Sequence, residues 1–474
     1  MPACWGIKGL QTPIPDYSRV MTIKRFPALL AALLMGGCQS VSSLGDHMAA
    51  TVGLGDDSPK AYTSSSVSEP SRGGAAVADE PLAARQGALA LQAGGNAVDA
   101  VSTMFFTLTA TYPVAAGLGA GGICLVRDTS GQVREFDFLS RTPSRGGLHA
   151  VPGAVRGFAD MQKQLGALPW QRVVAPGEAY AATGFPISQA LSQRLIESQA
   201  LLPHDPVLRA EFTDQGKVLA AGEETRDMLL GDTLSQVRLN GADGFYKGIV
   251  AGRIEAASQV LGGAVDMNEL AAVKTVVTAP RSRGMGAITA WLPNARTGAG
   301  IFTASLMDNL RGGGSLSQAA QAALAGFGVS ALPHDLGSTG FAAVDANGQA
   351  ASCAVTLNGP FGSARTVGNT GVQLAAAPVG PAGLASAFLT PLIATGGEGT
   401  VAIVGAGGPN GTAAAVNALQ QVSSGRQLGR RGDLRGTGNA PFDTVNMVSC
   451  DGTSCVGLSD PGAHGLGAVA EAVQ

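Results

Sequence analysis

The chain has little charge and few aromatic side chains. Of its 474 residues, 14% are charged and 5% are aromatic, and the formal net charge at pH 7 is −3. Since no cluster of Lys and Arg is present to neutralise a phosphate backbone, we expect no nucleic-acid partner. The low aromatic content argues against a surface that stacks bases or sugars. The 45% hydrophobic content is still ample for the core of a globular protein.

The motifs of conventional catalytic and cofactor sites are missing. The sequence has no G-x-S-x-G elbow, no H-E-x-x-H, no paired C-x-x-C and no P-loop, so we expect neither a metal nor a cofactor. Its five histidines are scattered among loop-like segments and do not assemble a Ser-His-Asp triad: His47, His149, His204, His334 and His464. His334 is close to Ser338, but a single His beside a turn is more often a surface residue.

A G-x-G-x-x-G spacing occurs at Gly117, Gly119 and Gly122. A dinucleotide-binding fingerprint needs a strand before the glycines and a helix after them. Here a helix-like segment precedes and a strand-like segment follows, so nucleotide binding is not expected.

The N-terminal part has the form of a secretory signal. In "MTIKRFPALLAALLMGGCQS", residues 21–40, a basic pair precedes an apolar run of about nine residues and a cysteine. The run is too short to span a bilayer as a stable helix. "LMGGC" resembles a bacterial lipobox, which makes Cys38 the lipidated first residue of the mature protein. An ordinary signal peptide is the alternative.

These features predict an exported protein that a lipid anchor holds on the periplasmic side of the bacterial envelope. Gln39 after the cysteine, rather than Asp, favours the outer membrane. Residues 1–37 are interpreted as an upstream extension, with Met21 the expected start, and the signal peptide. Residues 38–74 are rich in Ser, Gly and Asp without periodicity, which predicts a flexible tether.

Four further cysteines lie in the body of the chain. Cys450 and Cys455 flank a "DGTS" turn between two apolar runs, so a disulfide across a hairpin and a pair of thiols are both open. Cys124 and Cys353 lie in apolar strand-like runs, where we expect buried free thiols.

Local patterns predict helices in the middle of the chain and strands toward both ends. Pro81 opens a helix that Gly94-Gly95 closes, and a second helix follows Asn96. The remaining expected elements are a strand, a turn and a strand within 117–138; helices over 150–275 with boundaries at Pro169, Pro176, Pro186 and Pro203; strands at 285–293, 340–358, 399–408 and 444–450; and helices at 315–328 and 411–422. This order indicates an α+β fold.

Five segments together carry a family resemblance. They are "LQAGGNAVDA" (91–100), "GLGAGGICLVRD" (117–128), "VPGAVRGFADMQKQLGALPWQRVVAPGEAYAATGFPIS" (151–188), "STGFAAVDANGQAASCAVTLNGPFGS" (338–363) and "LSDPGAHGLGA" (458–468). In this order they resemble the successive signature blocks of the γ-glutamyltransferase family. The resemblance implies an αββα sandwich of the N-terminal-nucleophile hydrolase type with a helical mid-region. It also implies a precursor that cleaves itself into two chains, 75–337 and 338–474, which stay together as a heterodimer in one domain.

Self-cleavage answers a chemical need. A hydroxyl is a poor nucleophile at neutral pH without a base, and an α-amino group with a pKa of about 8 on the same residue supplies one. Cleavage between Gly337 and Ser338 would put Ser338 first in the new chain. The glycine allows the strained backbone that an N-to-O acyl shift requires.

The family's Thr-Thr-His block falls on Ser338, Thr339 and Gly340, counted back from Val344-Asp345. Ser338 is the expected nucleophile and Thr339 the alternative. Without a gap, the family's supporting Thr and Asn fall on Thr356 and Asn358. By this resemblance Thr356 orients the nucleophile, and Asn358 hydrogen-bonds the amino group or the substrate. A plain strand end and turn is the alternative for both.

The substrate-binding positions depart from the family pattern. Leu139 stands where the family has the arginine that binds the substrate carboxylate, and Arg141, two residues on, is the expected replacement. The other departures are Gly380 in place of an acidic residue and Ala387 and Phe388 in place of paired serines. Gly407 and Gly408 remain as a candidate oxyanion hole of backbone N–H groups.

Three functions stay open. The first is a γ-glutamyltransferase or hydrolase that takes a small γ-glutamyl donor such as glutathione and passes the acyl group to an amino acid or water. The second is a self-processing amidase or acylase for a less polar acyl amide, as Leu139, Ala387 and Phe388 suggest. The third is a catalytically degenerate envelope protein on the same scaffold.

Overall fold

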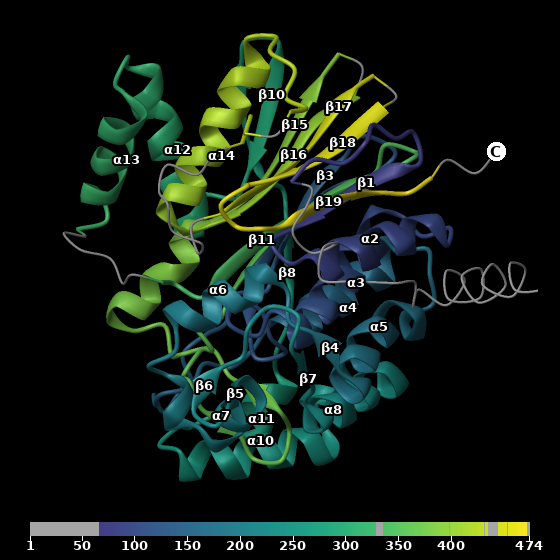
Figure 1. The fold of residues 1–474 in the computed structure, drawn as a ribbon. Helices are drawn as coiled ribbons and strands as arrows, with labels where there is room; N and C mark the ends of the chain where they lie inside the picture. The colour runs from purple at the N-terminus through teal and green to yellow at the C-terminus, as the bar shows by residue number, and fades with distance from the viewer. Residues whose placement is uncertain are drawn as a thin grey trace, which may run out of the picture. The chain divides into compact units, whose positions relative to one another are not determined.

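Two antiparallel sheets form the centre of the computed structural model, which describes residues 66–328, 335–397, 399–430, 432–434, 444–452 and 454–471. One sheet has the strand order β19-β1-β11-β12-β2-β3-β8 and the other β18-β17-β16-β15-β10-β9 (Figure 1). The strands of the first are β1 (Gly74–Ala78), β2 (Gly121–Arg127), β3 (Val133–Asp137), β8 (Val276–Thr278), β11 (Ser338–Asp345), β12 (Ala350–Thr356) and β19 (Leu466–Val469). Those of the second are β9 (Arg281–Met285), β10 (Ile288–Leu292), β15 (Leu389–Gly396), β16 (Gly399–Gly407), β17 (Val445–Asp451) and β18 (Ser454–Ser459).

The two sheets pack face to face between two layers of helices. β11 and β12 of the first sheet lie against β15 and β16 of the second. Helices α2 (Pro81–Gln92) and α3 (Ala97–Thr111) cover the outer face of the first sheet, and α12 (Gly298–Arg311) and α14 (Gly408–Ser423) cover the second (Figure 1). This αββα layering confirms the predicted fold class.

The alternation of side chains along β11 explains why its middle, residues 341–344, is apolar on both faces. Phe341 and Ala343 pack on the helix side of the sheet, whereas Ala342 and Val344 pack against the facing sheet. Successive residues of a strand point to opposite faces, so a strand covered on both sides needs apolar residues at every position.

Local start signals in the sequence are realised at α2 and α3. The Asn96 side chain caps α3, and the Asp99 carboxylate accepts from the Asn96 backbone N–H, which completes a capping box. Pro81 stands in the first turn of α2, and the Glu80 side chain accepts from Ala83 N. Both helices therefore begin where the sequence predicts.

A helical region connects the two halves of the first sheet, as expected over 150–275. It contains α4 (Ala154–Leu165), α5 (Trp170–Thr183), α6 (Gln189–Glu197), α7 (Pro206–Phe212), α8 (Met228–Asn240), α9 (Asp243–Tyr246), α10 (Gly248–Val260), α11 (Met267–Ala271), the 3₁₀ turn η2 (Leu202–His204) and the short strands β4 (Phe185–Pro186), β5 (Thr213–Asp214), β6 (Lys217–Val218) and β7 (Glu224–Thr225). The boundary predicted at Pro176 is wrong, because Pro176 lies inside α5. Close packing of α5 on α3 supports the helix there: a Cβ on Gly177 would lie 2.1 Å from the Phe106 carbonyl oxygen.

The remaining elements lie in the second half of the chain. They are α13 (Leu316–Ala325), β13 (Thr366–Val367), β14 (Val372–Gln373) and the 3₁₀ segment η3 (Gly380–Phe388). The sequence predicted α13 and α14 but not α12, whose first residues include two glycines.

Cys124 and Cys353 stand opposite each other on neighbouring strands β2 and β12, with their sulfurs bonded at 2.05 Å. The prediction of two free thiols is therefore wrong. The cysteines are 229 residues apart, and only the strand pairing brings them together. Cys450 and Cys455 are also bonded, across the β17–β18 hairpin, so the disulfide alternative holds there.

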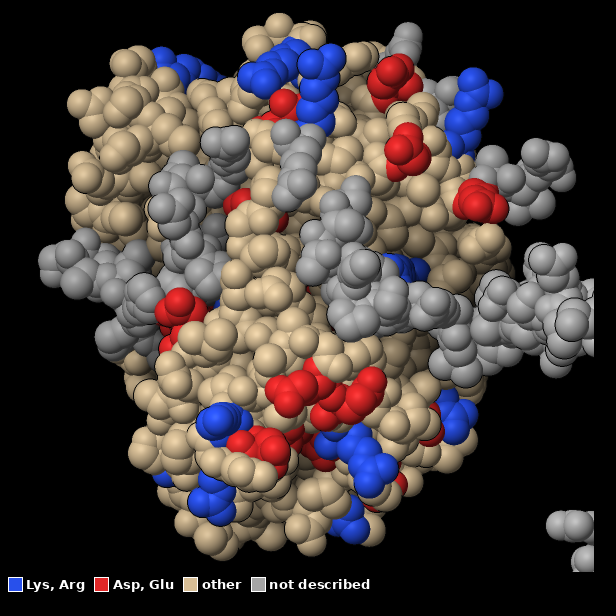
Figure 2. All heavy atoms as spheres, in the orientation of Figure 1, with Lys and Arg blue, Asp and Glu red and all other residues tan. Residues whose placement is uncertain are grey.

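The segment before β1 is joined to the fold. Val67 and Ser71 form β-bridges with Leu458 and Cys455, so residues 66–73, which were assigned to the tether, lie along β18. Cys38, the signal peptide and His334 lie outside the described residues. Within the described ranges no helix is long and apolar enough to cross a membrane. On the face in Figure 2, Lys and Arg side chains are interspersed with Asp and Glu.

Candidate active site

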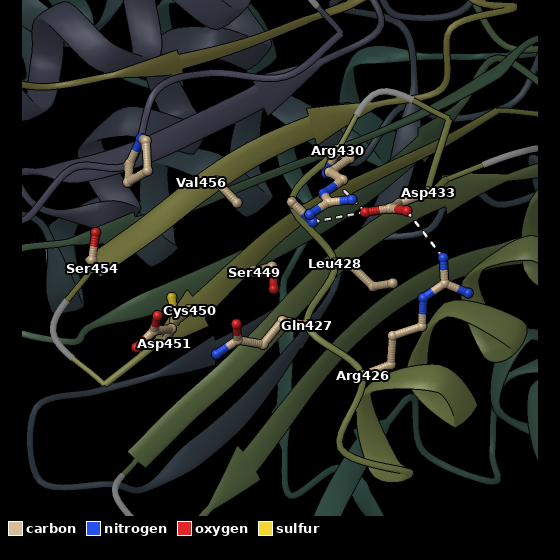
Figure 3. Close-up of a pocket in the computed structure, with 12 residues that line it drawn as sticks. Arg426, Gln427, Leu428, Arg430, Asp433, Ser449, Cys450, Asp451, Ser454 and Val456 are labelled. Carbon is tan, nitrogen blue, oxygen red and sulfur yellow. Dashed lines mark hydrogen bonds and ion pairs between the residues drawn. The ribbon is translucent and has the colours of Figure 1, made fainter.

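A pocket of about 410 Å³ opens beside the C-terminal end of β17 and the N-terminal end of β18 (Figure 3). Its wall includes the ion pair of Arg426 and Asp433, at 3.1 Å. The residues that line it are Pro70, Arg426, Gln427, Leu428, Gly429, Arg430, Asp433, Ser449, Cys450, Asp451, Ser454 and Val456. No residue predicted for catalysis is among them.

Ser338 lies elsewhere, as the first residue of β11. It is 1% exposed and stands opposite Thr356 of β12. The Ser338 hydroxyl has no hydrogen-bond partner among the described residues. A Cβ on Gly407, the last residue of β16, would come within 2.7 Å of the Ser338 Oγ. The hydroxyl therefore faces the junction of β16 and α14.

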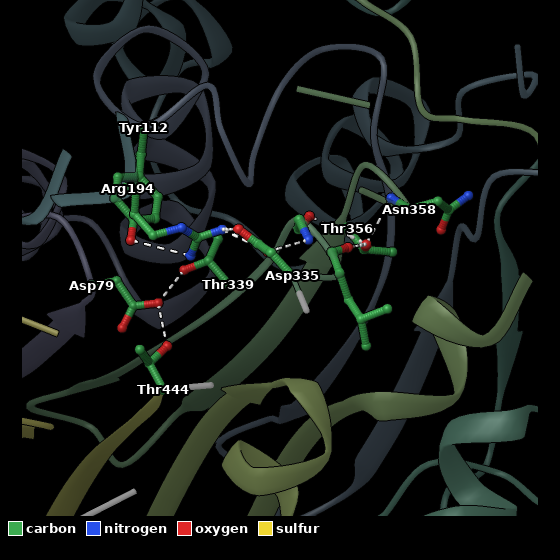
Figure 4. Close-up of polar contacts among 10 residues, drawn as sticks. Asp79, Tyr112, Arg194, Asp335, Thr339, Thr356, Asn358 and Thr444 are labelled. Carbon is green, nitrogen blue, oxygen red and sulfur yellow. Dashed lines mark hydrogen bonds and ion pairs between the residues drawn. The ribbon is translucent and has the colours of Figure 1, made fainter. Parts of the chain in front are cut away.

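Both backbone polar groups of Gly337, the residue before Ser338, are hydrogen-bonded. Figure 4 shows the neighbouring side chains of Asp335, Thr356 and Asn358. The Gly337 N–H donates to Asp335 Oδ1 at 2.7 Å. The Gly337 carbonyl oxygen accepts from the Leu357 N–H at 2.9 Å, and the Thr356 Oγ1 lies 3.2 Å from it. The Leu357 N–H therefore lies where negative charge would develop if the Ser338 oxygen attacked this carbonyl. The single Thr356 hydroxyl proton can turn to the same oxygen or to the nearer Leu336 carbonyl.

Gly337 itself is required by the backbone. Its φ is +57°, and a Cβ would lie 1.9 Å from the Gly359 carbonyl oxygen. Only glycine fits such a close approach in the left-handed region. Gly337 thus uses the backbone freedom that the sequence indicates, while a part for this backbone in an acyl shift stays a prediction.

Thr356 and Asn358 form a short chain of contacts beside this peptide. The Thr356 hydroxyl also lies 3.0 Å from the Leu336 carbonyl and accepts from the Asn358 N–H at 2.8 Å. The Asn358 side-chain amide donates to Ala376 O at 2.8 Å and to Ser140 Oγ at 3.3 Å. Thr356 is thus placed to contact the carbonyl, while the role of Asn358 toward an amino group or substrate stays a prediction.

Thr339, the alternative nucleophile, is engaged with a buried carboxylate. Its Oγ1 donates to Asp79 Oδ2 at 2.6 Å. Asp79 also accepts from Thr444 Oγ1 and Asn446 Nδ2, each at 2.7 Å. Burial raises the pKa of Asp79, and hydrogen bonds from these three side chains oppose the rise. The Thr339 hydroxyl has a strong acceptor, whereas the Ser338 hydroxyl has none among the described residues.

Gly340 occupies the histidine position of the family pattern, and the packing of the sheets explains it. A Cβ at Gly340 would lie 2.2 Å from the Ala406 nitrogen and the Gly405 carbonyl carbon. β11 and β16 approach too closely here for any side chain.

An ion pair that the sequence did not predict holds the residues just before Ser338 in place. Arg194 of α6 is completely buried, and its Nη2 donates to the two carboxylate oxygens of Asp335 at 3.0 and 2.9 Å. The guanidinium also lies 5.5 Å from the centre of the Tyr112 ring. The one local signal available was the position of Asp335 three residues before Ser338, in a turn-like "DLGS".

Gly407 and Gly408 lie where β16 passes into α14. Gly407 precedes the helix, and its N–H donates to Thr444 O at 3.4 Å. Gly408 has φ +78° and begins α14, whose first-turn N–H groups have no partner within the helix. The structure brings this pair to Ser338, and the oxyanion role stays a prediction.

The residues expected to bind substrate are more dispersed. The Arg141 guanidinium is exposed and donates to the Glu269 carbonyl at 3.0 Å. Leu139 packs against a small apolar cluster between the sheets. Phe388 is fully buried, with its ring 4.7 Å from that of Phe302. Ala387 is also buried, so neither position supplies an open pocket wall.

No group of three or more His, Cys, Asp or Glu that could hold a metal occurs within the described ranges. His149 is buried, and desolvation lowers its pKa. It pairs in a β-bridge with Ala376, the residue whose carbonyl receives the Asn358 amide.

The fold and the unpartnered serine at a strand start define an αββα protein with a candidate nucleophile inside the chain. Residues 83–323 match the sequence model of the family described as gamma-glutamyltranspeptidase. The chain belongs to the γ-glutamyltranspeptidase family. The matched region ends before Ser338, so the match does not test the site.

Curated relatives and a solved structure agree with this assignment. The chain is 29% identical over 277 residues to the glutathione hydrolase proenzyme of Escherichia coli, covering 53% of this chain and 46% of that protein. It is 30% identical over 262 residues to the corresponding Pseudomonas aeruginosa protein, covering 50% and 45%. The chain thus spans about half the length of these relatives. A cephalosporin acylase from Bacillus halodurans superposes with a TM-score of 0.71 at 18% identity, covering 85% of this chain and 97% of that one, which shows the shared fold.

Proposed function

We propose that this protein cleaves itself after Gly337 and then hydrolyses or transfers the acyl group of γ-glutamyl amides such as glutathione, with Ser338 as nucleophile. The observation that carries the proposal is a Ser338 hydroxyl with no hydrogen-bond partner among the described residues, next to a Gly337 carbonyl that the Leu357 N–H donates to and the Thr356 hydroxyl approaches. Ser338 is preferred to Thr339 because the Thr339 hydroxyl is bound to Asp79.

Self-cleavage proceeds by an N-to-O acyl shift. The Ser338 oxygen attacks the Gly337 carbonyl carbon, and the Leu357 N–H and the Thr356 hydroxyl stabilise the charge on the carbonyl oxygen. The C–N bond then breaks, and the serine proton passes to the nitrogen. Water hydrolyses the resulting ester, which leaves a carboxylate on Gly337 and a free amino group on Ser338.

Turnover uses the new amino group as the base. It accepts the Ser338 hydroxyl proton as the oxygen attacks the substrate γ-amide, and it returns the proton to the departing amine. The acyl-enzyme then passes its acyl group to water or to an amino acid. Backbone N–H groups at Gly407 and Gly408 are the proposed donors to the substrate oxyanion, because this junction faces Ser338. The Gly408 N–H lies in the first turn of α14, whereas the Gly407 N–H must first give up its bond to Thr444 O.

A second candidate is an amidase for a less polar acyl group. Its support is Leu139, which lies next to Ser140, a contact of the Asn358 side chain. Since Phe388 and Ala387 are buried in the core, they add little to this alternative.

The lipid anchor at Cys38 and export to the envelope remain part of the proposal.

The test compares chromogenic anilides that share one leaving group. The proposal expects the processed protein to hydrolyse the γ-glutamyl anilide faster than anilides of uncharged acyl groups, and Ser338→Ala to hydrolyse neither. Preference for the uncharged acyl groups would favour the amidase. No hydrolysis of any anilide by a processed protein would favour the degenerate scaffold.

A further inference from the structure

We propose that the Cys124–Cys353 disulfide joins the two chains of the processed protein covalently. The inference rests on the proposed cleavage after Gly337, since Cys124 precedes that bond and Cys353 follows it. After cleavage the two cysteines belong to different chains, so the disulfide becomes the covalent link between them.

The position of the bond in the sheet supports this role. In the first sheet, β1, β2, β3 and β8 precede the proposed cleavage point, whereas β11, β12 and β19 follow it. The two parts therefore meet at β19–β1, β1–β11 and β12–β2. The disulfide bridges the last of these boundaries, at a register where Cys353 pairs directly with Cys124.

The same strand connects the disulfide to the candidate active site. Cys353 is three residues before Thr356 on β12, and Thr356 pairs with Ser338 on β11. The disulfide thus attaches β12, the strand beside Ser338, to the chain that ends at Gly337. Backbone hydrogen bonds between β12 and β2 also hold the two chains together in the folded protein. The disulfide differs from them because it keeps the chains joined after the fold opens.

Both sulfurs belong to residues that are 0% exposed. Thiol–disulfide exchange requires a thiolate to reach a sulfur atom. A small thiol such as reduced glutathione, which is a proposed substrate, therefore cannot reduce the link while the protein is folded. Formation of the bond removes two electrons and two protons from the thiols. It needs a disulfide oxidant, the class of oxidant found in the oxidising compartments that receive exported proteins.

The second disulfide provides a matched control. Cys450 and Cys455 both follow Ser338, and their bond closes a hairpin within one chain. Loss of this bond cannot release one chain from the other.

The experiment is denaturing gel electrophoresis of the full chain, exported to an oxidising compartment and unfolded in the presence of an alkylating agent, which caps any free thiol as the chain opens. We expect one band near full length without reductant and two bands with reductant, the smaller beginning at Ser338. The double variant Cys124→Ala, Cys353→Ala should give two bands in both lanes, and Cys450→Ala with Cys455→Ala should behave as the wild type.

The outcomes separate this inference from the proposed function. Two bands for the wild type without reductant would overturn the covalent link and leave self-cleavage intact. One band in both lanes would overturn self-cleavage, and with it the link between two chains. Peptide mapping under non-reducing conditions decides the bond even if the double variant fails to fold: a cross-linked peptide with Cys124 and Cys353 is expected, and two alkylated cysteines would contradict the proposal.

Discussion

Asp335 accepts a hydrogen bond at 2.7 Å from the backbone N–H of Gly337, the residue before the candidate nucleophile. Its carboxylate is held in turn by the completely buried Arg194. This relay connects helix α6 of the helical region to the proposed cleavage point. The backbone geometry at Gly337 thus depends on Arg194, a residue that is far away in the sequence.

Replacing Arg194 by Met should destabilise the protein by about 3–5 kcal/mol, because it leaves the Asp335 carboxylate buried without its partner. The additional change Asp335→Asn should restore a large part of this loss, because it removes the second charge and keeps an oxygen acceptor for the Gly337 N–H. Urea unfolding of both variants measures the effect. The matched control is Lys247→Met in the exposed pair with Asp243, for which we expect a loss below about 1 kcal/mol. A double variant as unstable as Arg194→Met alone would contradict this interpretation of the pair.

Thr356→Ala should slow self-cleavage by about 10²–10³-fold, the usual cost of removing one donor to an oxyanion. Thr356→Ser keeps the hydroxyl, which lies 3.2 Å from the Gly337 carbonyl oxygen, and should cleave at a rate close to that of the wild type. The fraction of cleaved chain against time gives both rates. Equal rates for the Ala and Ser variants would show that the hydroxyl has no part in the step.

Gly407→Ala should block the nucleophile, because the added methyl group would lie 2.7 Å from the Ser338 Oγ. The control is Gly284→Ala, whose methyl group would meet no atom within 4 Å. We expect cleavage and anilide hydrolysis to fall sharply in the first variant and to stay unchanged in the second. Normal activity of Gly407→Ala would rule out this position for the serine.

Glu80 should make stability depend on pH. Burial raises its pKa from 4.5 to about 7, while its carboxylate accepts from Ala83 N and Thr111 Oγ1. Because the pKa of this carboxyl is higher in the folded state than in the unfolded state, the protonated group stabilises the fold. This stabilisation is complete below pH 4.5 and is lost as the pH rises through about 7.

The size of this effect is roughly 3 kcal/mol. Glu80→Gln keeps an oxygen acceptor without the titration, so its unfolding free energy should fall less between pH 4.5 and 8 than that of the wild type. Urea unfolding at several pH values is the measurement, with the exposed Glu69→Gln as control. Parallel curves for the wild type and Glu80→Gln would contradict the assignment.

Sequence patterns predicted the elements that local signals determine. Asn96 with Asp99 and Pro81 are start signals within one helical turn, and both helices begin as expected. The sequence indicates backbone freedom at Gly337, whereas its positive φ and the close approach of the Gly359 carbonyl come from the fold.

Local signals do not indicate which residues far apart in the sequence come into contact. The register of β2 and β12 brings Cys124 to Cys353, and nothing near either cysteine indicates its partner. Arg194 is the same case, because a charged residue in a short helix is ordinarily solvated, and only the fold encloses it with Asp335. The Leu357 N–H could not be predicted either, since every residue except proline carries such a donor.

The most direct test of the account is the N-terminal sequence and mass of the fragments from the purified, reduced protein. We predict a small fragment that begins at Ser338 and a larger one that ends at Gly337, with Ser338→Thr still cleaved and Ser338→Ala intact. A wild-type chain that stays uncleaved, or a small fragment that begins at Thr339, would contradict it.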